Sequence, residues 1–162
     1  MAELTNIESK VGEVLGLAQA AQDSTEKVAS MTLDDELKQR LQQMKQEAAE
    51  TEERTTELAG QLEGKKTAIL DKARETKREA SEMMRTYLGS DADELDGFEF
   101  LTMAEAAEVG HWQIVGKMNE RAQLPGLDEL VAWVTPIQER HFQETLRGSL
   151  KLASEEDPHE PA

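Results

Sequence analysis

Apolar side chains recur at alternating steps of three and four residues through most of this 162-residue chain, and no proline precedes residue 125. This spacing gathers the apolar side chains on one face of a helix, as in the seam of a coiled coil or a helical bundle. The strong helix formers Ala, Leu, Glu, Gln, Lys and Arg dominate the composition, whereas valine, isoleucine and aromatic residues are sparse. The sequence therefore predicts an all-α fold.

Glycines and helix-capping residues divide the repeat into separate segments. The spacing keeps its phase across Gly60 and Gly64, which leaves two interpretations open. The chain forms either one helix about 75 Å long or two helices that fold back at these glycines. Pro136 lies inside the last segment and predicts a kink or a bulge there. The predicted helices cover residues 4–31, 37–62, 69–87, 95–122 and 127–153.

Helices of similar length joined by short connections are typical of an antiparallel bundle. We expect a single helical-bundle domain over residues 1–153, with four core helices. Residues 64–88 form either an extra helix or an extension of the second one. The polar segment 154–162 is expected to be a disordered acidic tail.

Composition and charge argue against several classes of function. The 34 acidic and 18 basic residues give a formal charge of −16, and this disfavours nucleic-acid binding, which needs a basic surface. The chain has no cysteine, which excludes disulfides, zinc–thiolate centres and cysteine nucleophiles. The sequence contains no glycine-rich phosphate-binding loop, so nothing in it indicates a nucleotide cofactor. Neither histidine in the helical segments has a definable haem pocket. No apolar run approaches the roughly 20 residues of a membrane span, and the N-terminus does not resemble a secretory signal, so we expect a cytoplasmic protein.

The stretch AEAAEVGHW, residues 104–112, places charged groups in an otherwise apolar helix. A helical projection puts Glu108 in the middle of the apolar face, with His111 on one edge and Glu105 on the other. A carboxylate in a core costs several kcal/mol unless it is protonated, paired or bound to a metal. The Glu108-x-x-His111 spacing also brings a carboxylate and an imidazole to one metal in helical bundles.

The last helix carries one candidate ligand on each of two apolar stripes, Glu139 and His141. On a straight helix the two cannot point at one centre, although a bulge at Pro136 would rotate the following turn. The sequence thus predicts a metal site formed by Glu108, His111, Glu139 and His141. The metal-free alternative is an ion pair between Glu108 and His141.

Several segments resemble the ferritin-like superfamily and, within it, the YciE/YciF group of stress-associated bacterial proteins. DGFEFLTMAEAAEVGHWQI is similar to the third-helix segment of that family, which ends in a Glu-His-Tyr-Glu-Ile-like motif. LDELVAWVTPIQERHFQETL is similar to its last helix. His111 and Ile114 match the motif and Glu139 matches an acid of the last helix, whereas Gly110 and Gln113 stand where the motif has glutamates.

This resemblance implies a ferritin-like antiparallel four-helix bundle. Together with the buried Glu108 it leads us to expect iron or manganese at the residues predicted above. It also implies a role in oxidative or general stress response, while leaving open whether the protein is an enzyme. The alternative is a metal-free interaction protein that keeps the ferritin-like scaffold and uses the heptads of residues 37–87 as a dimerisation or partner surface. We further expect a homodimer that binds neither nucleic acid nor membrane.

Overall fold

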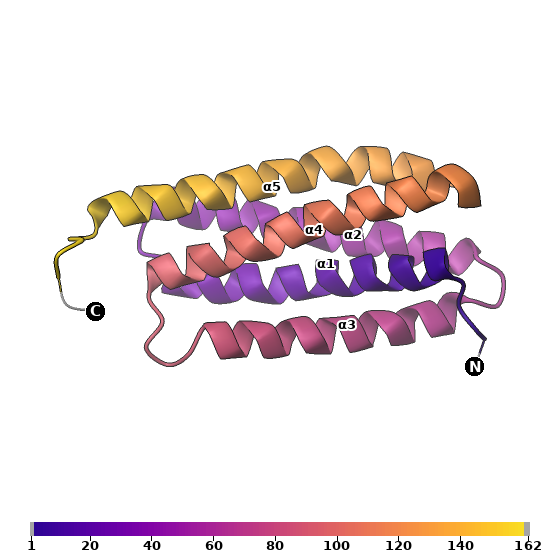
Figure 1. Ribbon diagram of the computed structural model, residues 1–162, viewed down its shortest axis with the longest axis horizontal. Helices are drawn as coiled ribbons and strands as arrows, with labels where there is room; N and C mark the ends of the chain where they lie inside the picture. The colour runs from indigo at the N-terminus through magenta and orange to yellow at the C-terminus, as the bar shows by residue number, and fades with distance from the viewer. Residues whose placement is uncertain (1, 161–162) are drawn as a thin grey trace.

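The computed structural model describes residues 2–160, and it confirms the all-α prediction (Figure 1). No β-strand occurs in this part of the chain. The helices begin and end within a few residues of the predicted bounds. They are α1 (Asn6–Met31), α2 (Asp35–Gln61), α3 (Lys66–Tyr87), α4 (Glu94–Ala122) and α5 (Leu127–Glu155).

The chain folds back between α2 and α3, so the single 75 Å helix is wrong and the two-helix interpretation is correct. The turn spans residues 62–65. Gly64 has a φ of +71°, a backbone conformation that glycine adopts without steric cost. The unbroken heptad phase on either side therefore belongs to two antiparallel helices.

Short polar side chains fix where three of the helices begin. The side chain of Thr5 accepts a hydrogen bond from the backbone N–H of Glu8, whose carboxylate accepts from the N–H of Thr5. Asp93 and Asp96 form the same reciprocal capping pair at the start of α4, and Asp34 caps α2. These bonds satisfy backbone donors that a helix N-terminus otherwise leaves free.

The helices form an elongated bundle with α1 near its middle (Figure 1). α1 packs against α2, α3 and α4, while α5 packs against α4 and contacts α2. α1, α3 and α5 run in one direction and α2 and α4 in the other (Figure 1). Because α2 and α4 are parallel, the chain must return along the whole bundle between them. α3 makes that return on the outside of the four other helices.

Helix α5 continues through Pro136 to Glu155 without interruption. It therefore includes the first two residues of the predicted tail, 154–162. Residues 161 and 162 of that tail lie outside the described residues. Among the described residues, no helix has the length and apolar character that a membrane crossing requires.

The core consists of two apolar clusters near opposite ends of the bundle. One includes Leu15, Trp112 and Val134, and the other includes Val28, Phe98 and Leu152. Between them, α1, α2, α4 and α5 bury polar side chains among small apolar ones such as Ala18 and Ala48. This polar middle layer contains Thr25, Thr51, Thr55, Glu105, Glu108, Gln138, His141 and Thr145.

Candidate functional site

The threonines of the middle layer donate their hydrogen bonds to carbonyls of their own helices, whereas the acids, the amide and the imidazole have no such partners. Thr51 and Thr55, for example, donate to the carbonyls of Glu47 and Thr51. Four groups then need partners from other helices, and each is at most 4% exposed: Glu105 and Glu108 from α4, and Gln138 and His141 from α5. These four residues are the candidate site.

His141 lies between two carboxylates from different helices. Its Nε2 is 2.5 Å from Oε2 of Glu47 on α2, and its Nδ1 is 3.6 Å from Oε2 of Glu105 on α4. Burial lowers the pKa of His141, but the two carboxylates outweigh burial and raise the pKa above its usual value. The raised pKa favours the protonated form of His141, which supplies the positive charge of this layer.

Glu47 is held at the edge of the layer by three donors. Its Oε2 receives the His141 ring, while Oε1 accepts from Arg140 at 2.5 Å and from Gln43 at 3.1 Å. Burial raises the pKa of Glu47, but the hydrogen bonds from His141, Arg140 and Gln43 outweigh it and lower the pKa. Glu47 is thus a fixed anion that orients the imidazole.

Glu108, in contrast to Glu47, has a raised pKa and no cationic partner. Its Oε2 accepts a hydrogen bond from the amide of Gln138, and no cation reaches it. Burial and the nearby charge of Glu105 raise its pKa well above the usual value, and the Gln138 bond opposes this only in part. A carboxyl group in these surroundings holds a proton unless a cation replaces it.

Two buried polar atoms of this site have no hydrogen-bond partner, Glu105 Oε2 and Gln138 Oε1, and a third such atom, Trp112 Nε1, belongs to one of the apolar clusters. The 3.6 Å separation between Glu105 and His141 is too long for a hydrogen bond. An unsatisfied buried polar atom costs about 1–3 kcal/mol, so each one requires an explanation such as strain, a catalytic role, a water or an ion. Glu105 and Gln138 therefore leave hydrogen-bonding capacity unused inside the core.

The structure brings two of the four predicted ligands together. Glu108 and His141 both lie in the middle layer, but they pair with Gln138 and with Glu47 rather than with each other. Glu139 is exposed on α5. His111 is half-buried, and its Nδ1 donates to the carbonyl of Ala107, one turn earlier, at 2.8 Å. Within residues 2–160, no group of three or more His, Asp or Glu side chains is positioned to hold a metal ion.

The sequence pattern did not indicate Gln138 or Glu47 as residues of the site. Gln138 lies three residues before His141, so a helical projection puts both on one face of α5. Glu47 precedes the buried seam residue Ala48 and is rotated about 100° from it. Its long side chain nevertheless reaches His141, which a projection of α2 alone does not predict.

No protein-family model, curated protein or solved structure matches this chain. Its function is therefore argued from the geometry of the middle layer.

Proposed function

We propose that this protein is a ferritin-like bundle that binds one iron or manganese ion through Glu105, Glu108 and His141. The order of the helices supports the ferritin-like part of the proposal. Two antiparallel hairpins, α1–α2 and α4–α5, are joined so that α2 and α4 run parallel (Figure 1). Ferritin-like folds likewise contain one long crossover, and their metal ligands project into the middle of the bundle. Here α3 takes the place of the crossover.

The observation that carries the metal proposal is the unpaired Glu105 oxygen next to an imidazole nitrogen. Glu105 Oε2 and His141 Nδ1 are 3.6 Å apart. Two donor atoms bound to one ion at about 2.1 Å, and about 90–110° apart, are separated by roughly 3.0–3.4 Å. An inward movement of these side chains that also brings in Glu108 would create a three-ligand site.

The outer contacts of the cluster also suit a metal. A metal-binding histidine commonly donates its other ring N–H to a carboxylate, which fixes the tautomer and the ring orientation. Glu47 occupies that position at Nε2 of His141. Gln138 donates in the same way to Glu108. Glu139 and His111 have no part in this proposal, because the first is exposed and the second bonds to its own helix.

Charge gives a further reason to expect a cation. Arg140 pairs with Glu47 at the edge of the layer, but inside the layer a single imidazole faces the two carboxyl groups of Glu105 and Glu108. A divalent ion would displace the proton from Glu108 and compensate the carboxylates. An iron ion held by carboxylates and an imidazole supplies chemistry with dioxygen or peroxide, which would fit the stress role implied by the YciE/YciF resemblance.

The test is metal content, measured on tag-free protein that was expressed with added iron and manganese and purified without chelators. We expect about one equivalent of iron or manganese per chain. Glu105→Gln should lose most of it, because the amide cannot replace the carboxylate charge. Glu139→Gln is the matched control, since it makes the same change at an exposed position, and it should retain the metal. Negligible metal in the wild-type protein would overturn the proposal, as would equal loss in the two variants.

A second candidate function, a metal-free interaction protein, is favoured by one observation. Glu47 and Glu105 flank His141 on both ring nitrogens, so a protonated imidazole partly neutralises the layer without any metal. On this interpretation the layer specifies how the helices pair, as buried polar groups do in coiled coils. The heptad seam of α2 is buried within the bundle, so it is unavailable as the partner surface. Absence of metal, together with a solution mass of a dimer or a larger complex, would support this candidate.

A further inference from the structure

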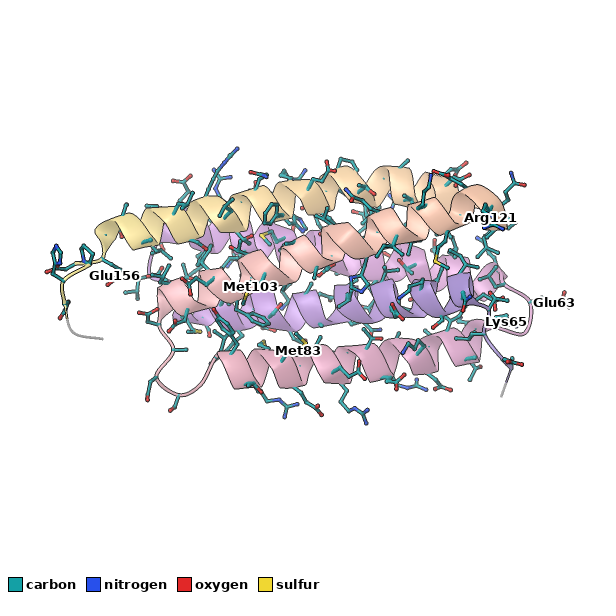
Figure 2. All side chains as sticks on the ribbon, viewed as in Figure 1. Glu63, Lys65, Met83, Met103, Arg121 and Glu156 are labelled. Carbon is teal, nitrogen blue, oxygen red and sulfur yellow. The ribbon has the colours of Figure 1, made fainter. Side chains whose placement is uncertain are left out.

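An apolar cavity of about 230 Å³ lies between α1, α3 and α4. Its wall on α3 includes Ala80, Met83 and Met84, and its wall on α4 includes Met103 and Ala104. Figure 2 shows Met83 and Met103 along the facing edges of these two helices. Met83 is 67% exposed and Met103 is 50% exposed, so flexible apolar side chains surround the opening.

The inner wall of the cavity includes one of the buried acids, Glu108. The three hydroxyl groups in the wall already donate hydrogen bonds: Ser24 and Ser81 to carbonyls of their own helices, and Tyr87 to the carboxylate of Glu99. Glu108 receives one hydrogen bond, from Gln138 to Oε2. Its other oxygen is therefore available to a molecule in the cavity. An apolar cavity with a few polar groups in its wall is typical of a binding site for a small molecule.

The surrounding charges restrict the polar end of that molecule. The wall residues include no lysine, arginine or histidine, and the charge of Glu105 acts on Glu108. The chain as a whole carries a formal charge of −16. A negatively charged head group would be desolvated beside carboxyl groups with no cation to pair with it. An uncharged head group such as a hydroxyl, which can both donate and accept a hydrogen bond, complements the carboxyl group of Glu108.

We propose that this cavity binds a small amphiphile, with its unbranched apolar chain between α3 and α4 and an uncharged hydroxyl-type head group hydrogen-bonded to Glu108. Size agrees with this class, because the cavity is smaller than the roughly 300–1,000 Å³ of sites for drug-sized ligands. The adaptable methionine side chains suit an unbranched chain that lacks a fixed shape. The binding requires no metal and goes beyond the function proposed above.

The methionines provide a direct readout of binding. With ¹³C-labelled methionine methyl groups, 1-octanol is titrated into metal-free protein and followed by NMR. We expect the resonances of Met83, Met84 and Met103 to shift with saturation, while those of Met31 and Met118, which lie outside the cavity wall, stay in place. Octanoate, which has the same chain length and an anionic head group, should bind at least about tenfold more weakly. Equal affinity for the two probes would overturn the position of the head group, and unshifted cavity methionines would overturn the site.

Matched alanine substitutions test the cavity itself. Ala104→Leu fills the space from α4 and should weaken octanol binding at least about tenfold. Ala106→Leu makes the same change two residues along the helix, where the side chain is exposed and outside the wall, and should bind octanol normally. If Ala104→Leu fails to fold, Ala80→Leu fills the same space from α3. Normal binding by a folded cavity-filling variant would overturn the proposal.

Glu108→Leu tests the polar end separately. It removes the only carboxyl group in the wall, so the preference for octanol over octanoate should disappear. A retained preference would show that the head group lies elsewhere. Because every titration uses metal-free protein, a negative result leaves the metal proposal unaffected, and absence of metal leaves this one unaffected.

Discussion

The contact between α1 and α3 and the polar middle layer are both buried, but different forces govern them. Along α1, Gly12 and Gly16 let the backbone of α3 approach closely. A Cβ on Gly16 would overlap the carbonyl oxygen of Ala73 and lie 2.7 Å from the Cβ of Thr76. Shape therefore governs this contact. In the middle layer, Glu105, Glu108 and His141 leave charge and unpaired atoms inside the protein, so electrostatics governs there.

Because of this difference, the stability of the two regions should depend on different changes. The α1–α3 contact should respond to volume and be indifferent to pH and metal. The middle layer should respond to charge, to protons and to added cations. Substitutions that change one property at a time test whether the bundle is divided in this way.

His141→Leu should have the largest effect, because it leaves Glu105 without its cationic neighbour and removes a bond to Glu47. Loss of one partner of a buried ion pair costs about 3–5 kcal/mol. We expect a loss near the lower end, about 3 kcal/mol, in the free energy of unfolding of metal-free protein at pH 7. Denaturant titration measures it. His111→Leu is the control and should cost less than about 1 kcal/mol, and equal losses would contradict the special position of His141.

Adding Glu105→Gln to His141→Leu sharpens that result. The double variant removes the uncompensated charge as well as the cation. It should recover about 1 kcal/mol or more relative to His141→Leu alone. Purely additive losses would mean that Glu105 and His141 are not coupled.

Gly16→Ala should be the next largest effect, since α1 and α3 must separate to admit one methyl group. Overpacking of this kind costs about 1–3 kcal/mol. Gly110→Ala on α4 is the matched control: no atom lies within 4 Å of its added Cβ, so it should gain about 0.5–1 kcal/mol from helix propensity. Both differences should be the same at pH 5 and pH 8. A pH-dependent loss in Gly16→Ala would contradict the division between the two regions.

The stability of the metal-free middle layer should fall as pH rises. Glu108 has a raised pKa in the folded state, so its contribution is complete below 4.5, its ordinary value, and is lost as pH rises through the folded pKa. His141 acts in the same direction above its ordinary value of 6.5. Glu47, whose pKa is lowered, acts in the opposite direction only at acid pH.

Glu108→Gln isolates that pH dependence. Its free energy of unfolding should equal that of the wild type or lie slightly below it at pH 4.5. At pH 8 it should be about 1–2 kcal/mol higher, because no carboxyl group must then ionise in the core. Urea denaturation across this pH range, in the presence of a chelator, measures both proteins. A difference that does not change with pH would contradict the protonation of Glu108.

Glu139→Gln should have the smallest effect. Its side chain is exposed, so the free energy of unfolding should change by no more than about 0.5 kcal/mol. The same denaturation experiment measures it. A loss as large as that of His141→Leu would place Glu139 back among the functional residues.

Much of this fold was predictable, because helix formation here depends on local patterns. The three- and four-residue spacing, the capping residues and the glycines at 60 and 64 placed every helix within a few residues of its bounds. The residues that face the bundle interior on α2, such as Leu41 and Met44, were likewise predictable from helical periodicity. The choice between one long helix and two required the structure, because the heptad phase fits both.

The site was predictable only in part. A projection of α4 singled out Glu108, and one of α5 singled out His141, because each interrupts an apolar stripe of its own helix. The same reasoning included Glu139, which is exposed, and omitted Gln138. Helical projection treats each helix as an isolated cylinder, and it cannot say which groups on neighbouring helices come within reach.

The sequence alone determined that the chain is helical, where its helices begin and end, and that the fourth and fifth helices bury ionisable groups. Only the tertiary structure decided that Glu47 and Glu105 flank His141, that Gln138 pairs with Glu108, and that a cavity between α1, α3 and α4 reaches that glutamate. The physical reason is that helix formation depends on neighbours within one or two turns. The state of a buried charge depends on side chains that are often more than 30 positions away in the chain and are brought together only by packing.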